Sequence, residues 1–221
     1  MIHLNFPSKS QMLPAFDIAL HSSSIDAENC EQLVKVVVKE QPNIIAIKSS
    51  NPNDDPNWIT GKLWAYNFLD FDYPCVRYLR KFIYSNYLEY ALFCSIDSSK
   101  PVYVQCWANI INNDGRIITP HNHADAHGDA PPVYSYISGN ISLQTENTST
   151  FFAHPILHKK VYREVPNKNG ELILFPSFIT HWTSQNLSNA PRITIAFDII
   201  TEEVYNMVDN TNYRLLTKEN I

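Results

Sequence analysis

Three of the eight histidines of this chain lie within residues 120–128, a segment that reads PHNHADAHG. Because alternate side chains of an extended strand point to the same face, His121, His123 and Asp125 would project together from such a strand. Imidazole nitrogens and a carboxylate that converge on one point suit a divalent transition metal. Two histidines separated by one residue also arise easily by chance, so the segment taken alone is better explained as a polar surface loop.

A second group of residues, farther along the chain, has the chemistry that would complete such a site. His181 follows a predicted strand that ends in a Pro-Ser turn. Arg192 and Thr194 come next on the last predicted strand, where alternation places both side chains on one face. An arginine presents a planar fork that can hold a carboxylate through two hydrogen bonds. Tyr134 and Tyr136 share one face of a strand beside the histidines and add two phenol hydroxyls.

Each of these residues also has a simpler structural explanation. Arg192 alone would be expected to form a salt bridge at the rim of the fold, and His181 alone to be a hydrogen-bonded core histidine beside Trp182. Their fixed spacing along the chain favours a shared site instead. The other histidines outside the cluster have no such neighbours, and we expect them to be structural or exposed: His3, His21, His154 and His158.

The elements that must position these residues are mainly β-strands. After Lys100 the sequence alternates between apolar runs and turn residues, which predicts strands over residues 101–111, 116–121, 132–138, 140–145, 151–154, 160–165, 171–175 and 191–200. We expect 132–138 and 140–145 to pair as a hairpin that turns near Ser138 and Gly139. About eight strands at this spacing predict a double-stranded β-helix, the two-sheet jelly roll shared with cupins.

The first hundred residues have a different pattern. An edge strand is expected within the first twenty, and Asp26 can cap a helix that runs to about Glu40, with Pro42 just beyond its end. Residues 49–60 are predicted to form a loop, and a second helix is predicted over about residues 74–94. We therefore expect one mainly β domain over residues 1–221, with flanking N-terminal helices. Residues 1–100 would form a helical and edge-strand support, and residues 101–200 would form the core with the metal site.

Composition limits the partners that the protein can have. The formal net charge of −5 gives no global basic field, so a nucleic-acid partner is not expected. No apolar run reaches the length of about 18 residues that a membrane helix needs, and the N-terminus lacks the features of a signal peptide. Four cysteines without CxxC spacing suggest buried free thiols. These observations predict a soluble, cytoplasmic protein that does not bind membranes.

Short motifs across residues 103–200 resemble those of the Fe(II)/2-oxoglutarate-dependent dioxygenases. The likeness is greatest to a small subgroup that reads W-A-N…G…P-H-x-H…Y-Y…G…L-x-x-F-P-S…H…R-x-S-x-A-F. The matching residues here are, in order, Trp107, Ala108, Asn109, Gly115, Pro120, His121, His123, Tyr134, Tyr136, Gly170, Leu174, Phe175, Pro176, Ser177, His181, Arg192, Thr194, Ala196 and Phe197. Each motif is weak alone, but their common order is fairly specific. The first hundred residues carry only a vague likeness.

The resemblance implies a double-stranded β-helix that binds Fe(II), 2-oxoglutarate and O2. It implies that 2-oxoglutarate is decarboxylated to succinate while an unidentified substrate is oxidised, usually by hydroxylation. In this comparison His121, His123 and His181 would hold the metal and act in catalysis. Arg192 and Thr194, with Tyr134 or Tyr136, would bind 2-oxoglutarate.

The chain departs from the usual H-x-D/E motif of these enzymes, because the carboxylate position falls on His123. A site of His121, His123 and His181 would carry one negative charge less than two histidines and a carboxylate. Asp125 offers an alternative, since His123 and Asp125 themselves form an H-x-D motif. The pair His127 and Asp129 is a third and more remote choice.

Two other functions fit parts of the pattern. A cupin-like metal enzyme that does not use 2-oxoglutarate would also use neutral histidine ligands. A non-catalytic β-sandwich binding protein would hold a structural metal or none. Structural sites are usually closed by four ligands, whereas three ligands on strands leave an open and reactive position. This count favours an enzyme.

Overall fold

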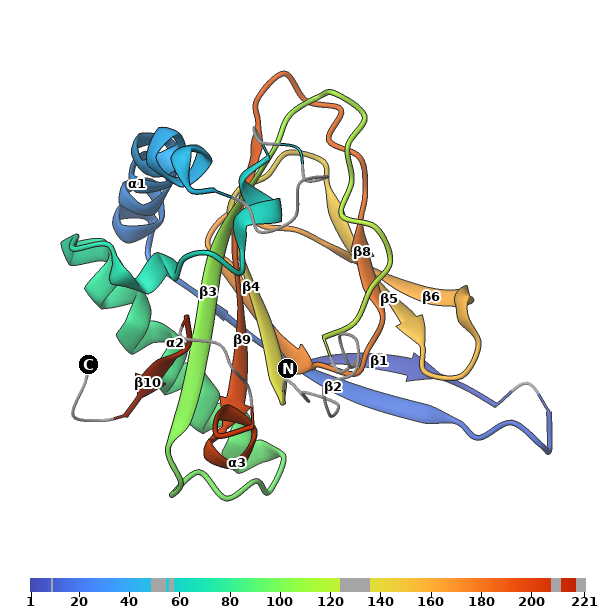
Figure 1. The fold of residues 1–221 in the computed structure, drawn as a ribbon. Helices are drawn as coiled ribbons and strands as arrows, with labels where there is room; N and C mark the ends of the chain where they lie inside the picture. Colours follow the sequence, from blue (N-terminus) through green and yellow to red (C-terminus); the bar gives the residue numbers. More distant parts are fainter. Residues whose placement is uncertain (9, 49–54, 56–57, 124–135, 208–211, 218–221) are drawn as a thin grey trace.

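Two antiparallel β-sheets face each other and form the core of the fold (Figure 1). The computed structural model describes residues 1–8, 10–48, 55, 58–123, 136–207 and 212–217. The larger sheet has the strand order β1-β2-β7-β4-β9-β3-β10, and the smaller has the order β6-β5-β8. The chain is mainly β with helices in its N-terminal half, as the sequence predicted.

The strands are β1 Ile2–Phe6, β2 Phe16–Ser24, β3 Val102–Ile111, β4 Ile137–Gln144, β5 Ser149–His154, β6 His158–Pro166, β7 Glu171–Pro176, β8 His181–Thr183, β9 Arg192–Thr201 and β10 Arg214–Leu216. The helices are α1 Ala27–Ala46, α2 Pro74–Phe93 and α3 Glu202–Tyr205, with 3-10 turns at Ile59–Lys62 and Phe68–Asp70. No helix in the described part of the chain combines the length and the apolarity that crossing a bilayer requires.

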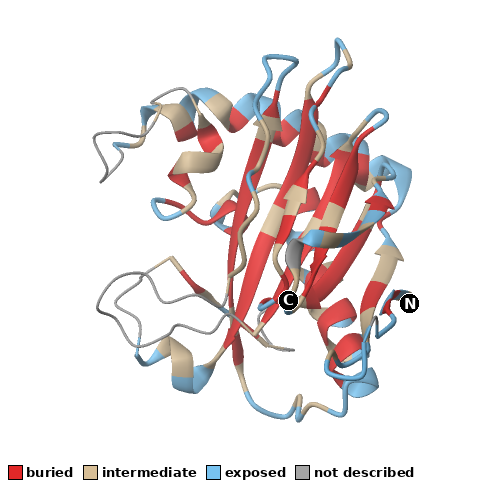
Figure 2. Ribbon diagram, turned by 90° about the vertical axis from the view of Figure 1, so that its right-hand side faces the viewer, coloured by how far each residue is buried: buried red, intermediate tan, exposed pale blue. Residues whose placement is uncertain are grey.

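Helices α1 and α2 cover the outer face of the larger sheet (Figure 1). Alternation along β9 explains this arrangement, because Ile193, Ile195 and Phe197 all point to the same side and are buried there with helix residues. Figure 2 shows that the central strands of this sheet are buried along most of their length. The face of β9 that points away from the helices is also buried, and it faces the smaller sheet.

Helix α1 runs past the end that the sequence predicted. Asp26 caps it as expected, with its side chain accepting a hydrogen bond from the Asn29 amide. The helix does not stop at Glu40, however, but continues through Pro42 to Ala46. Ile44 lies in this extra turn and is fully buried, so its packing offsets the backbone hydrogen bond that a proline cannot make.

The predicted hairpin across Ser138 and Gly139 is wrong. Residues 137–144 form one continuous strand, β4, between β7 and β9; residues 132–135 lie outside the described part of the chain. A Ser-Gly pair often marks a turn, but Gly139 has another role here. A Cβ atom on Gly139 would lie 2.2 Å from Cζ of the Phe197 ring, so the glycine makes room for that ring.

The segment before the first histidines is less regular than predicted. Residues 116–121 were expected to form a strand, but only an isolated bridge between His121 and His181 joins them to β8. The Ile118 amide also donates to the Thr183 hydroxyl, 3.1 Å away. The segment therefore extends the smaller sheet beside β8. Strand β8 itself is short and was not predicted from the sequence.

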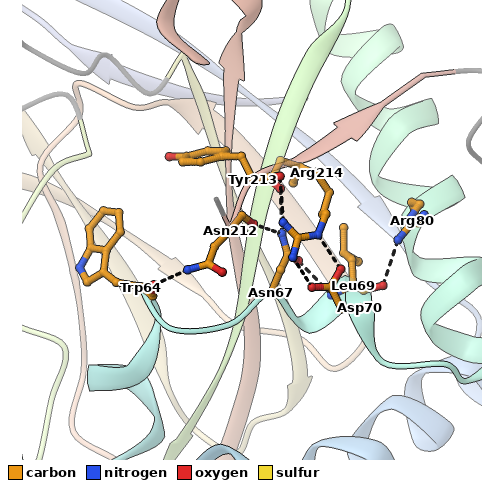
Figure 3. A network of polar contacts seen from close by, with 9 residues as sticks. Trp64, Asn67, Leu69, Asp70, Arg80, Asn212, Tyr213 and Arg214 are labelled. Carbon is orange, nitrogen blue, oxygen red and sulfur yellow. Dashed lines mark hydrogen bonds and ion pairs between the residues drawn. The ribbon is translucent and has the colours of Figure 1, made fainter. Parts of the chain in front are cut away.

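The C-terminal strand β10 is joined to the edge of the larger sheet by a polar network (Figure 3). The buried Asn67 side chain donates to the Val104 carbonyl at 2.9 Å and to the Asn212 carbonyl at 2.7 Å. Arg214 forms an ion pair with Asp70 at 2.5 Å. These contacts link the chain end to the 3-10 turns that precede α2.

The cysteines are free within the described residues, as predicted, but they are not all buried. Cys30, Cys75 and Cys106 lie in the core, whereas Cys94 at the end of α2 is exposed. Burial raises the pKa of the Cys106 thiol well above its usual value, so this thiol stays protonated.

The packing around Gly139 predicts that Gly139→Ala destabilises the protein by about 1–3 kcal/mol, the usual effect of overpacking a core. The Phe197 ring is fully buried and has no free space into which to move. Urea unfolding measures this loss. Combining Gly139→Ala with Phe197→Leu should give a smaller loss than the sum of the two single variants. An unchanged unfolding free energy in Gly139→Ala would contradict the packing argument.

Candidate metal centre

Three histidines from two neighbouring backbone segments meet between the sheets. The His121 amide donates to the His181 carbonyl at 3.1 Å, and the His181 amide donates back to His121 at 2.8 Å. The His123 amide donates to the Ser177 carbonyl at 3.0 Å, in the turn before β8. One ring nitrogen from each of the three histidines lies within 4.8 Å of the others. The strand geometry thus brings together the residues that the sequence proposed as the first choice of metal ligands.

Hydrogen bonds to carbonyls determine the proton position on two of the rings. Nδ1 of His121 lies 2.7 Å from the Thr119 carbonyl, and Nδ1 of His181 lies 3.0 Å from the Ile179 carbonyl. A carbonyl oxygen can only accept, so both Nδ1 atoms carry the proton. In the neutral rings the Nε2 atoms therefore present lone pairs.

His123 is held in the same way, but by a charged partner. Its Nδ1 donates to Oδ2 of Asp198 at 2.6 Å, and the ring stacks on Trp107 at a centroid distance of 5.9 Å. Oδ1 of Asp198 accepts a second hydrogen bond from the Ser138 hydroxyl at 2.6 Å. All three imidazoles thus use Nδ1 for hydrogen bonding and leave Nε2 available, the arrangement that metal-binding histidines adopt.

Two of these lone pairs face each other at close range. Nε2 of His121 lies 3.0 Å from Nε2 of His123. Two acceptors at this distance repel each other unless a cation, either a proton or a metal ion, lies between them. Two nitrogens that each lie at about 2.1 Å from one ion, at right angles, are roughly 3.0 Å apart. The spacing of this pair therefore fits two ligands of one divalent metal ion.

The electrostatics of the three rings differ. Burial, with contributions from the other two rings, lowers the pKa of His181 well below its usual value. Burial and the neighbouring His123 also lower the pKa of His121. Burial acts to lower the pKa of His123 as well, but the charge of Asp198 and its hydrogen bond outweigh it, so that this pKa is raised. His121 and His181 therefore keep free lone pairs, while Asp198 attracts a cation to the third ring.

Arg192 lies on the same face of β9 as Asp198 and has a charge that the described residues do not pair. Its side chain is only 2% exposed, and its Nε and Nη1 atoms have no hydrogen-bond acceptor there. Burial lowers the pKa of its guanidinium to about 10. A buried arginine with unused donors costs free energy until an acceptor binds. A ligand carboxylate is the acceptor that its planar fork fits best.

Thr194 lies next to Arg192 on this face, two residues along β9. Its Oγ1 accepts a hydrogen bond from Nδ2 of Asn109 at 3.2 Å, which leaves the threonine hydroxyl hydrogen free to donate elsewhere. The structure thus places Arg192 and Thr194 together, both buried, as alternation along the strand predicted. A carboxylate held there would receive hydrogen bonds from both side chains.

Tyr136, the remaining predicted site residue that the structure describes, does not join this face of β9. Tyr136 is half-buried and packs with the core that α1, α2 and the larger sheet form, and its amide donates to the Ile199 carbonyl at 2.9 Å. Its ring therefore belongs to the helix side of the sheet. Tyr134 and Asp125 lie outside the described residues, as do His127 and Asp129, so their roles stay predictions.

Sequence reasoning missed Asp198, although the signal was present. Arg192, Thr194 and Ala196 lie two residues apart and share one face of β9, and the same spacing places Asp198 on that face. Two asparagines beside this face of β9 were also missed. Asn109 and Asn140 flank β9 on β3 and β4, and the Oδ1 atom of each is buried without a hydrogen-bond donor among the described residues.

The sequence has a recognisable family relationship in this region. Residues 105–198 match the family described as "Putative 2OG-Fe(II) oxygenase", where 2OG stands for 2-oxoglutarate. This segment contains His121, His123, His181, Arg192 and Asp198. No curated protein matches the sequence significantly.

Solved structures share the fold over most of the chain. A prolyl-4-hydroxylase from Pseudomonas putida covers 84% of this chain and 89% of its own, with 11% identity and a TM-score of 0.56. SnoN, a non-heme alpha ketoglutarate dependent epimerase from nogalamycin biosynthesis, covers 91% and 92%, with 10% identity and a TM-score of 0.59. A prolyl hydroxylase from Trichoplax adhaerens, solved with a peptide of hypoxia inducible factor, covers 86% and 87%, with 9% identity and a TM-score of 0.59. The predicted double-stranded β-helix is confirmed.

The unpaired guanidinium of Arg192 predicts a stability effect that is independent of any activity. Arg192→Met replaces the buried charge with an apolar chain of similar length. The ligand-free variant should therefore gain about 1–3 kcal/mol in unfolding free energy. Chemical denaturation measures the change. Arg214→Met is the matched control, since Arg214 is paired with Asp70 and its loss should not stabilise the protein. A destabilised Arg192→Met variant would mean that the guanidinium is already satisfied.

Proposed function

We propose that the protein uses Fe(II), O2 and 2-oxoglutarate to oxidise a substrate, since residues 105–198 match the 2OG-Fe(II) oxygenase family. In this proposal His121, His123 and His181 are the protein ligands of the iron. The facing lone pairs at 3.0 Å on His121 and His123 are the single observation that carries it. They make this arrangement unfavourable without a cation and favourable with one.

The choice of co-substrate rests on Arg192. When bound, Fe(II), O2 and 2-oxoglutarate would together supply the oxidising chemistry: one oxygen atom of O2 would enter succinate as 2-oxoglutarate loses carbon dioxide, and the other would oxidise the substrate. Arg192 would hold the distal carboxylate of 2-oxoglutarate through Nε and Nη1, the two donors without an acceptor. The Thr194 hydroxyl would donate to the same carboxylate. A cupin-like enzyme without this co-substrate would have no use for a buried, unpaired arginine beside its metal.

Phenylalanine rings from both sheets would help to exclude water. The Phe175 centroid, on β7 of the larger sheet, lies 4.7 Å from His181, and the Phe152 centroid, on β5 of the smaller sheet, lies 6.1 Å from it. These rings contribute to the burial of His181, and shielding from solvent would protect a reactive site from competing reactions.

Hydroxylation of a C–H bond is the reaction that we propose, with a substrate that stays unidentified. Prolyl hydroxylases and an epimerase share this fold, so the fold alone does not select the outcome. A metal held by His121, His123 and His181 would keep further coordination positions open for a co-substrate and for oxygen. This count supports an oxygenase over a closed structural site.

Anaerobic titration tests the proposal. Adding Fe(II) and 2-oxoglutarate together to the metal-free protein should produce a visible charge-transfer absorption that neither produces alone. His181→Ala should abolish the absorption. Arg192→Met should weaken apparent 2-oxoglutarate affinity by about tenfold to a hundredfold, the effect of losing a charge-assisted contact. His3→Ala, which changes an exposed histidine far from the site in the sequence, should behave as wild type.

The alternative functions give different results in the same titration. If metal binds but 2-oxoglutarate changes nothing, the protein is a cupin-like metal enzyme of another kind. If no divalent metal binds, the proposed function is wrong.

A further inference from the structure

We infer that Asp198 is a positioning residue that gives the three-histidine site the negative charge of a missing carboxylate ligand. The inference rests on the proposed function, because it concerns the same metal. In a site of two histidines and one carboxylate, the carboxylate binds the ion directly. Here a histidine, His123, stands in that position, and Asp198 lies on its far side.

The contacts of Asp198 hold it in one orientation. Oδ2 accepts the Nδ1–H of His123 at 2.6 Å, and Oδ1 accepts the hydroxyl of Ser138 at 2.6 Å. The Ser138 hydroxyl also lies 2.8 Å from that of Ser177, whose carbonyl accepts the His123 amide. Ser138 and Ser177 are both almost fully buried. The carboxylate and the backbone of the ligand it holds are thus tied into one connected network.

The network fixes both the direction and the charge of the ligand nitrogen. With Nδ1 donating to Asp198, the Nε2 lone pair of His123 can only point toward His121 and His181. Stacking on Trp107, with planes 20° apart, restrains the ring from the side. A carboxylate bonded to the far nitrogen makes an imidazole a stronger electron donor to a metal.

Charge counting shows why such a partner matters here. Three neutral imidazoles leave the full double charge of Fe(II) uncompensated in a buried site, where charges interact strongly. The negative charge of Asp198, which lies on the far side of the His123 ring, would reduce the net charge of the site from two to one. Asp198 also shares the inner face of β9 with Arg192, so one strand would carry both the charge partner of the metal and the contact for the co-substrate.

Two substitutions separate orientation from charge. Asp198→Asn keeps the shape and an oxygen that can accept the Nδ1–H of His123, but it removes the charge. Asp198→Ala removes both. The surface pair of His3 and Asp17, with Nδ1 and Oδ1 3.1 Å apart, provides a matched control through Asp17→Asn.

The first measurement is anaerobic Fe(II) binding, with the charge-transfer absorption of the 2-oxoglutarate complex as a second readout. Asp198→Ala should weaken Fe(II) binding by about 10–100-fold, as expected for a lost outer partner of a metal ligand. Asp198→Asn should lose less affinity, but its charge-transfer band should move to shorter wavelength, because the uncompensated iron is harder to oxidise. Asp17→Asn should match wild type in both.

The second measurement needs no metal and no activity. Nitrogen-15 NMR of the histidine rings reports which ring nitrogen carries the proton. In the metal-free wild type and in Asp198→Asn, Nδ1 of His123 should carry a proton. In Asp198→Ala, Nδ1 should lose that proton, and Nε2 should carry one that bonds to His121.

The outcomes distinguish this inference from the function on which it rests. Wild-type protein that binds Fe(II) and 2-oxoglutarate, with unchanged affinity and absorption in both Asp198 variants, overturns the inference and leaves the function standing. An Asp17→Asn variant that changes as much as Asp198→Asn also overturns it, because the effect would then be general. Wild-type protein that binds no Fe(II) contradicts both.

Discussion

Three imidazoles with converging lone pairs, one buried and two partly buried, form the constraint on which the rest of the structure depends. At 3.0 Å, Nε2 of His121 and Nε2 of His123 cannot both be acceptors without a cation between them. Neither ring can turn away cheaply, because each would lose the hydrogen bond from its Nδ1. Backbone hydrogen bonds from His121 to His181 and from His123 to Ser177 hold the three residues in place. The fold therefore positions the three histidine nitrogens before a cation binds.

The two sheets contribute different residues to this site. The smaller sheet, with the segment before residue 124, carries the rings themselves. The larger sheet carries their charge partner Asp198 and the buried Arg192 on its inner face, and it packs against α1 and α2 on its outer face. Along β9 the polar Arg192, Thr194 and Asp198 share the inner face, whereas Ile193, Ile195 and Phe197 share the outer face.

The sequence was most informative where one signal dominated. The spacing of about eight predicted strands was enough to propose the fold, and the order of His121, His123, His181 and Arg192 was enough to propose the site. It failed where tertiary contacts decide. The Ser-Gly pair at residues 138–139 looks like a turn, yet Gly139 serves the Phe197 ring from a neighbouring strand.

Other differences have the same origin. Pro42 was expected to end α1, but burial of Ile44 carries the helix onward. The phenol of Tyr136 was expected beside the site, but it packs on the helix side of the sheet. The sequence does not show which face of a strand points inward, because that depends on the residue at which the strand begins. Asp198 was overlooked since an aspartate at the end of an apolar strand has no local signature; only its contact with His123 reveals it.

The sorting of β9 also limits how such a protein can diverge. Inserting or deleting a single residue between Arg192 and Asp198 would exchange the two faces beyond that point, turning charged groups toward the helices and apolar ones toward the histidines. A change of length within this strand would therefore preserve both faces only if it involves two residues or if a β-bulge absorbs the single residue. Lineages of this protein can vary more freely in the connections between strands, where a new length leaves the alternation of β9 intact.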